Sequence, residues 1–170
     1  MDPSALFKLS YGVYIVGSHQ DEKINAQTAN SVMQITSEPP TVAVSINKKN
    51  LTHEYIASSK VFSVSILCQT TPLSFIGNFG FKSGRTVDKF IGIAKKIGQT
   101  GSPIVVDHSA AYFEAEVLQS VDAGTHTIFI GKVVDCAILN NEPVMTYEYY
   151  HLVKKGTTPK TAPTFIPKQE

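Results

Sequence analysis

Cysteine is scarce in this sequence, and the two that occur are not arranged as metal ligands. Among 170 residues the chain has only Cys68 and Cys136, and no C-x-x-C pair is present. Zinc, iron–sulfur and rubredoxin-type iron sites are usually built from closely spaced cysteine pairs, so none of these sites is encoded here. Each cysteine lies inside or at the end of an apolar run, which predicts that both are buried structural thiols.

Several motifs of hydrolases, metalloenzymes and nucleotide-binding folds are also missing. The five histidines never show an H-x-x-x-H spacing, and the chain contains no G-x-S-x-G, no G-x-G-x-x-G and no P-loop sequence. These absences argue against a metal site, an α/β-hydrolase, and a Rossmann or P-loop fold. They leave room for chemistry that a bound cofactor carries, for which the protein supplies placement rather than reactivity.

Charge and hydropathy give no sign of nucleic-acid or membrane binding. The formal net charge is +1 and charged residues make up 17% of the chain, so there is no basic field. No apolar run approaches the ~18 residues of a spanning helix, and no basic-then-apolar signal opens the chain. We therefore expect a soluble cytoplasmic protein with no nucleic-acid or membrane partner, and its length predicts one domain.

The spacing of apolar residues predicts a mostly β protein. Strands are expected at residues 13–17, 41–47, 61–67, 104–106, 112–118 and 125–138. Short helices are expected at residues 3–9, 52–59 and after 71–72. The first of these should turn Ala5, Leu6 and Leu9 inward, and Gly131 predicts a bulge or a close approach of two backbones. Six or seven short strands without strand–helix–strand alternation indicate an antiparallel barrel.

The stretch from Gln27 to Ile56 carries the most specific local pattern. It opens with the small and hydroxyl residues T-A-N-S at 28–31, which we read as a strand that a flat ligand can approach closely. After the break at Pro39-Pro40, the strand 41–47 leads to the polar loop N-K-K-N-L-T at 47–52 and then to a helix. Lysines, amides and a hydroxyl before a helix N-terminus favour an anion. Each piece alone is explained equally well as a thin strand or a solvated turn.

A second polar loop, F-K-S-G-R-T at 81–86, has Lys82, Ser83 and Arg85 around Gly84. Its cations and hydroxyl also suit a phosphate, although a plain surface turn remains an alternative. We predict that this loop and the 47–52 loop close on a single phosphate.

These segments resemble the flavin reductase-like family, whose FMN-binding split barrel carries a T-A-N/S-S strand, a Pro-Pro turn and a phosphate loop. The likeness covers QTANSVMQITSEPPTVAVSINKKNLTHEYI, FIGNFGFKSGRTVDKF and GTHTIFIGKVVD, and it is nearest to ferric reductases, flavoredoxins and rubredoxin-fused flavin modules. It implies an antiparallel Greek-key split barrel with a few short helices, a homodimer, FMN as cofactor, and NADH or NADPH as substrate. We expect the flavin domain to span residues 1–153 and an extended tail to span 154–170.

The parts of the flavin can be assigned to particular groups of residues. The two loops would hold the phosphate, and the 28–31 segment would meet the pyrimidine edge, where donors stabilise the charge that develops on reduction. Val32, Ile46 and Phe81 are candidates for the apolar bed of the dimethylbenzene side, although core packing explains them equally well. The predicted cofactor-binding residues are Gln27, Thr28, Ala29, Asn30, Ser31, Ser45, Ile46, Asn47, Lys48, Asn50, Thr52, Phe81, Lys82, Ser83 and Arg85.

His126 lies in Gly124-Thr125-His126-Thr127, which matches the G-D/T-H motif of the family. The resemblance implies that His126 is the catalytic residue that positions NAD(P)H beside the flavin, and a structural strand histidine is the alternative. Thr125 replaces the aspartate of many two-component flavin reductases, which leaves the choice of nicotinamide open. Hydride transfer depends on stacking at about 3–3.5 Å, so we predict no general base.

Two functions therefore stay open. The first is an NAD(P)H-dependent reductase that passes electrons to free flavin, a ferric chelate or a small redox protein. The second is a flavoredoxin-like carrier that binds FMN without oxidising NAD(P)H directly. Because the tail from Lys154 resembles the linker before rubredoxin in fused relatives, a separate rubredoxin or a flavodiiron protein is a possible partner.

Overall fold

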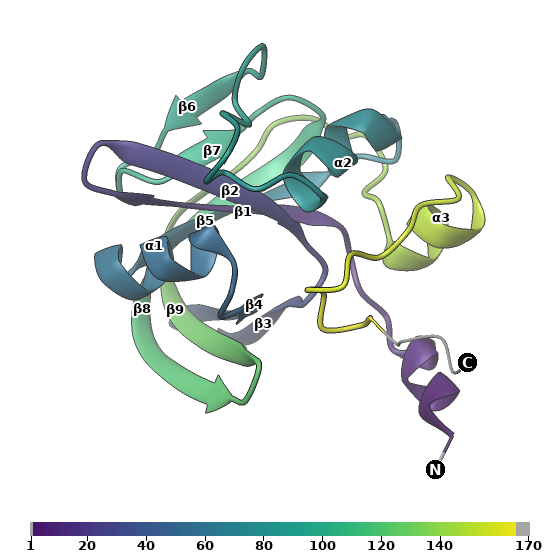
Figure 1. The fold of residues 1–170 in the computed structure, drawn as a ribbon. Helices are drawn as coiled ribbons and strands as arrows, with labels where there is room; N and C mark the ends of the chain where they lie inside the picture. Colours follow the sequence, from purple (N-terminus) through teal and green to yellow (C-terminus); the bar gives the residue numbers. More distant parts are fainter. Residues whose placement is uncertain (1, 166–170) are drawn as a thin grey trace.

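A computed structural model of the chain describes residues 2–165 (Figure 1). Its strands are β1 (Tyr14–Gln20), β2 (Lys23–Ala29), β3 (Val32–Ser37), β4 (Pro40–Asn47), β5 (Val61–Leu67), β6 (Lys95–Ile97), β7 (Pro103–Val105), β8 (Ser109–Ala123) and β9 (His126–Ile138). Its helices are the 3-10 helix η1 (Pro3–Lys8) and the α-helices α1 (Leu51–Ser59), α2 (Leu73–Gly80) and α3 (Tyr147–Leu152). No helix within residues 2–165 is long and apolar enough to cross a membrane.

Seven of the strands form one sheet in the order β2-β1-β5-β8-β9-β4-β3, while β6 and β7 pair with each other. Every pairing is antiparallel. The two border strands, β2 and β3, follow each other in the chain and are joined by residues 30–31. The sheet curls around but stays open between these borders (Figure 1). The prediction of a mostly β, antiparallel split barrel is confirmed.

Two apolar clusters fill the interior of the molecule. In the first, Phe75, Ile76 and Phe79 of α2 pack against β1 and β2. Their spacing of three and four residues places them on one face of the helix. Each such side chain contributes about 1.5–3 kcal/mol when it is fully buried. This docking fixes where α2 ends, so the loop that follows it begins at the open side of the sheet. The second cluster lies between β4, β5 and β9, with Phe62 and Phe129 at its centre.

Gly131 shows the close approach that its place in a strand predicts. A Cβ on this residue would stand 2.9 Å from the ring of Phe62 and 2.9 Å from the Cβ of Ala115. The pairing of β8 with β9 also shifts register beside it, between Val117 and Gln119. The backbone oxygen of Glu116 would lie 3.1 Å from the same Cβ, so the close approach is confirmed, while the extra residue of the register shift lies in β8 opposite Gly131.

Two other expectations are wrong. Ala5, Leu6 and Leu9 do not face inward, and the side chains of Leu6 and Leu9 are 60% and 56% exposed. The reason is that η1 is short and lies away from the sheet (Figure 1). Cys68 is buried as expected, but Cys136 is exposed. Because β4 pairs with only residues 126–132 of β9, the part that holds Cys136 is covered by β8 alone.

The T-A-N-S segment also differs from its predicted form. β2 ends at Ala29 and β3 begins at Val32, so the four residues finish one border strand and start the crossing to the other. These small residues therefore lie where the chain crosses the open side of the sheet from β2 to β3.

Candidate functional site

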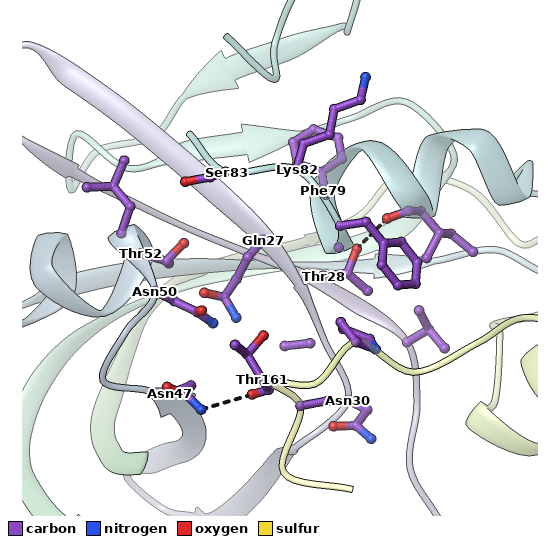
Figure 2. A pocket seen from close by; sticks show the side chains of 18 of the residues that line it. Gln27, Thr28, Asn30, Asn47, Asn50, Thr52, Phe79, Lys82, Ser83 and Thr161 are labelled. Carbon is purple, nitrogen blue, oxygen red and sulfur yellow. Dashed lines mark hydrogen bonds between the residues drawn. The ribbon is translucent and has the colours of Figure 1, made fainter. Parts of the chain in front are cut away.

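A pocket of about 300 Å³ lies at the open side of the sheet (Figure 2). One wall is β2, and the opposite wall is the end of β4 with the start of α1. The end of α2, the loop 81–84, α3 and residues 157–163 complete the lining. A volume of this size is typical of a small-molecule site.

The loop between β4 and α1 presents polar groups to the pocket. Asn50 is the N-cap residue of α1, and its side chain makes no capping hydrogen bond. Thr52 is fully buried, and its Oγ1 accepts a hydrogen bond of 2.8 Å from Nδ2 of Asn25. The Oδ1 of Asn47 accepts a hydrogen bond of 3.0 Å from the backbone N–H of Lys49. Because the first N–H groups of a helix are unpaired and partly positive, this end of the pocket suits an anion.

The loop after α2 reaches the same end of the pocket. Lys82 and Ser83 line it, and Gly84 lies next to Asn25. A Cβ at Gly84 would stand only 2.0 Å from Oδ1 of Asn25. Since the same Asn25 side chain donates to Thr52, the two polar loops are in contact through one buried amide.

β2 supplies the wall between these loops and the far end of the pocket. The Oε1 atom of Gln27 is buried and has no hydrogen-bond partner among the described residues. A buried acceptor left unpaired costs about 1–3 kcal/mol, so a ligand that donates here would be favoured. The hydroxyl of Thr28 donates to the carbonyl of Ile76 at 2.9 Å and ties β2 to α2. Nδ2 of Asn30 donates to Oγ1 of Thr164 at 2.9 Å.

A model of the flavin reductase like domain matches residues 6–156 of the chain. The chain belongs to this family. It is 56% identical over 170 residues to the high molecular weight rubredoxin of Moorella thermoacetica, and the alignment covers 100% of this chain and 74% of that protein. It is 46% identical over 166 residues to the ferric-chelate reductase (NAD(P)H) of Archaeoglobus fulgidus, with 98% of each chain covered. An FMN-binding protein of Thermus thermophilus superposes with a TM-score of 0.70 at 29% identity, covering 77% of this chain and 73% of that one.

The pocket of this flavin reductase-like chain has polar groups that fit a flavin mononucleotide. One end gathers helix N–H groups, amides and hydroxyls, as a phosphate monoester requires, while Nζ of Lys82 donates to Oδ1 of Asn78 at 3.0 Å and points away from the cavity (Figure 2). Along the wall, Gln27 offers the unpaired acceptor that an N–H of a pyrimidine ring would satisfy. Within residues 2–165, no cluster of three or more His, Cys, Asp and Glu side chains is arranged to hold a metal ion.

Most of the predicted cofactor-binding residues come together at this pocket. They are Gln27, Thr28, Ala29, Asn30, Ser45, Asn47, Asn50, Thr52, Phe81, Lys82 and Ser83. They reach it from β2, from the β4–α1 junction and from the loop after α2. Their contacts with FMN stay predictions.

Two predicted phosphate ligands, Lys48 and Arg85, are not among the lining residues. Nζ of Lys48 lies 2.7 Å from Oδ1 of Asp122, and the guanidinium of Arg85 forms a two-fold ion pair with Glu54. The hydrogen bond from Lys48 lowers the pKa of Asp122, and that from Arg85 lowers the pKa of Glu54. The neighbouring Lys49 lines the pocket instead. The two lysines lie in a turn closed by the hydrogen bond from Asn50 N–H to Asn47 O at 3.0 Å, and the sequence K-K does not reveal which of them faces inward.

Ile46 and Ser31 also lie outside the lining. Ile46 is 1% exposed and belongs to the second apolar cluster, where it packs in the core of the sheet. The hydroxyl of Ser31 donates to Oδ1 of Asn30 at 3.1 Å, so it acts on the pocket through that neighbour.

His126 lies beside the pocket rather than in its wall. It is the first residue of β9 and pairs with Asn47 of β4. One ring nitrogen, Nδ1, is 2.8 Å from Oγ1 of Thr125, and the other, Nε2, is 3.2 Å from the carbonyl oxygen of Thr161. The same carbonyl accepts a hydrogen bond of 3.3 Å from Nδ2 of Asn47. Thr161 lines the pocket (Figure 2), and its carbonyl oxygen is the contact through which His126 reaches the lining.

The C-terminal region builds a part of the pocket that the sequence did not predict. Residues 156–165, here called the C-terminal strap, run along the pocket and are held by several side chains. The hydroxyl of Tyr147 is 2.6 Å from Oγ1 of Thr158 and 3.0 Å from Oγ1 of Thr164. The hydroxyl of Tyr150 donates to the carbonyl of Thr157 at 2.8 Å. A stretch rich in Thr and Pro gives no apolar period, so its path could not be inferred from its composition.

Lys89 is a second residue that sequence reasoning missed. Its side chain is buried and lines the pocket, although the sequence shows only one lysine in a polar turn. Burial lowers its pKa to about 8. No local pattern in the sequence distinguishes it from the exposed lysines nearby.

Proposed function

We propose that this chain is an FMN-binding oxidoreductase that transfers a hydride from NADH or NADPH to flavin. The electrons then pass to free flavin, to a ferric chelate or to a small redox protein. The observation that carries the proposal is the contact of two polar loops, 47–52 and 81–84, at one end of a single pocket. Membership of the flavin reductase family and the 46% identity to a protein named ferric-chelate reductase (NAD(P)H) support it.

The loop end of the pocket holds the phosphate in this proposal. Three kinds of donor are available there. They are the side-chain amide of Asn50, which makes no capping hydrogen bond, the N–H groups at the start of α1, and the hydroxyl of Ser83. Thr52 can add its O–H proton, because its oxygen already accepts from Asn25 and a hydroxyl has one donor to give. Lys49 supplies positive charge at the rim, and Lys82 would have to leave Oδ1 of Asn78 to do the same.

The wall formed by β2 meets the flavin ring. Bound FMN accepts a hydride and passes electrons on, and this is chemistry that no side chain here can supply. Oε1 of Gln27 accepts from the pyrimidine N–H, which removes the cost of an unpaired buried oxygen. Phe79, which is 1% exposed, lies at the side of the pocket and keeps water from that wall.

His126 positions the nicotinamide in this proposal. Its place at the end of β9, next to Asn47 and in contact with the carbonyl of Thr161, supports the role. The hydride step needs the two rings to stack at about 3–3.5 Å, so the contribution of His126 is orientation rather than proton transfer. The carbonyl of Thr161 must release Nε2 before a nicotinamide can use it.

A homodimer is part of the proposal. Leu6, Phe7 and Leu9 around η1 are more than half exposed, and so is Met33 on the border strand β3. Exposed apolar side chains that lie together commonly mark protein interfaces, and an uncovered border strand is a frequent pairing site. A separate rubredoxin or flavodiiron protein is the proposed redox partner, and the 56% identity to a protein named high molecular weight rubredoxin supports the first of these.

A second candidate function is a flavoredoxin-like carrier that binds FMN but does not oxidise NAD(P)H. The contact between the strap and His126 favours it, because Thr161 occupies the ring nitrogen that a nicotinamide would approach. Thr125 at the position where many relatives of the two-component type have aspartate also permits it.

One experiment tests both candidates. The purified protein is titrated with FMN, and the absorbance of the flavin and the melting temperature are followed. Tight binding with a higher melting temperature is expected, and a protein that neither binds nor is stabilised would refute the proposal. The complex is then mixed without oxygen with NADH or NADPH in a stopped-flow instrument. Rapid bleaching of the flavin is expected for the reductase, whereas flavin that stays oxidised with both donors identifies the carrier.

A further inference from the structure

Lys89 is a buried cation in the wall of the pocket. The residue is only 5% exposed, and it lies in the turn between α2 and β6. Its Nζ donates to the carbonyl oxygen of Ala26 on β2 at 2.9 Å and to that of Phe79 near the end of α2 at 3.2 Å. The ammonium therefore sits between the border strand and the helix, at the pocket surface.

Its charge is not matched by a carboxylate. The ion pairs found among the described residues join Lys48 with Asp122 and Arg85 with Glu54, and neither involves Lys89. An ammonium group has three N–H donors, and two of them are used by the backbone carbonyls. Burying a charge without an opposite charge costs free energy, so such groups are commonly kept to meet a charged ligand.

The position of Lys89 relates it to the loop end of the pocket. Ala26, which accepts one of its hydrogen bonds, lies between Asn25 and Gln27 on β2. Asn25 is the residue that contacts both Thr52 and Gly84, where the two polar loops meet. Lys89 is thus bonded to the residue of β2 that adjoins the place where those loops meet.

We infer that the third N–H of Lys89 binds the phosphate monoester of FMN and makes the pocket select FMN over riboflavin. This inference rests on the proposed function and adds a residue to it. It also explains how the phosphate end gains a fixed cation while Lys48 and Arg85 are held by Asp122 and Glu54. A lysine that only joined β2 to α2 would treat the two flavins alike, since they differ in the phosphate alone.

The test compares FMN with riboflavin in the full-length chain. Affinities of both are measured by quenching of flavin fluorescence for the wild type, for Lys89→Met and for Lys95→Met. Lys95 is a matched control, because it lies on β6 outside the pocket with its ammonium 5.3 Å from the ring centre of Phe90. For Lys89→Met we expect FMN affinity to fall roughly 10- to 100-fold, the effect of losing one charged hydrogen bond, with riboflavin affinity unchanged. Lys95→Met should change neither.

The outcomes separate the inference from the proposed function. If neither flavin binds the wild type, the proposed function fails. If both bind and Lys89→Met weakens both equally or not at all, only the role of Lys89 is refuted. Where Lys89→Met does not fold, the ratio of FMN to riboflavin affinity of the wild type is followed between about pH 7 and pH 10. The other titratable side chains of the pocket are Lys49, Lys82, Tyr147 and Tyr150. A ratio that falls first near pH 8 supports Lys89, and a constant ratio overturns it.

Discussion

Gly84→Ala is the substitution that tests most directly whether the two polar loops work as one site. The backbone of Gly84 does not have a positive φ that would strain an alanine, so the effect of the new methyl group is steric. That methyl would lie 2.0 Å from Oδ1 of Asn25 and 3.2 Å from Cδ2 of Leu51, whereas ordinary contacts begin near 3.4 Å. Either Asn25 or the 81–84 loop must therefore move by more than about 1 Å.

The size of the expected loss of FMN affinity follows from the contacts that Asn25 makes. The residue is 4% exposed, and its amide donates 2.8 Å to the fully buried Thr52. Breaking that hydrogen bond leaves buried polar groups unpaired and costs about 1–3 kcal/mol. If the loop moves instead, Ser83 is displaced from the helix end that it faces across the pocket. We expect FMN affinity to fall about tenfold or more, where each tenfold corresponds to about 1.4 kcal/mol.

The assay combines FMN titration with urea unfolding of the protein without flavin. Gly77→Ala is the matched control, because its methyl would lie 3.7 Å from the ring of Phe81, an ordinary contact, inside α2. Alanine in a helix interior is favoured over glycine by about 1 kcal/mol, so this variant should keep its affinity and gain slight stability.

A double-mutant cycle with Asn25→Ala completes the test. Removing the amide that the methyl would strike should make Gly84→Ala much less damaging in the Asn25→Ala background. Strictly additive losses, or a Gly84→Ala variant with wild-type affinity for FMN, would refute the view that the loops are joined through Asn25.

Four further outcomes are expected. Lys48→Ala combined with Arg85→Ala should retain most FMN affinity in calorimetry, because both cations are held in surface ion pairs; a large loss would show that they turn to the phosphate. Gly131→Val should lower the free energy of unfolding by about 1–3 kcal/mol through overpacking while FMN affinity is kept, as measured by urea unfolding and titration. Because the pKa of Lys89 falls from 10.5 to about 8 on folding, the unfolded chain binds more protons between these values, so stability without flavin should rise with pH in that window. Lys89→Met should remove that rise in unfolding experiments. A chain ending at Lys155 should release FMN faster and show a lower KM for NADH in stopped-flow and steady-state assays, since the strap lines the pocket and covers His126.

Regular alternation made much of the fold predictable. The strand at residues 61–67 was placed correctly, because Phe62, Val64 and Ile66 alternate with Ser63 and Ser65. Helix α1 followed from the polar loop that precedes it. Leu6 and Leu9 were misplaced because their spacing indicates an apolar face but cannot show whether any surface is there to cover it.

The candidate site could be predicted where a motif and its neighbours act locally. The T-A-N-S segment and the two loops contain their polar groups within a few residues of one another, so composition was informative. Lys49 and Lys89 could not be chosen over other lysines, because their direction depends on contacts with Asn47 and with the distant carbonyl of Ala26. The path of the strap depends on Tyr147 and Tyr150 of α3, a short helix capped by Thr146, and their partners lie beyond the end of that helix.

The open sheet has one further mechanical consequence. Residues 30–31 link the two border strands covalently at one end, while further along β2 the two polar loops are held by side-chain contacts, those around Asn25 and the ion pair of Arg85 with Glu54. The two ends of the gap therefore differ in how easily they can widen. The backbone fixes the width of the gap near residues 30–31. Near Asn25, small shifts of side chains can widen it. Ligands that vary in bulk near Asn25 should be tolerated, whereas a thicker group near residues 30–31 should be rejected.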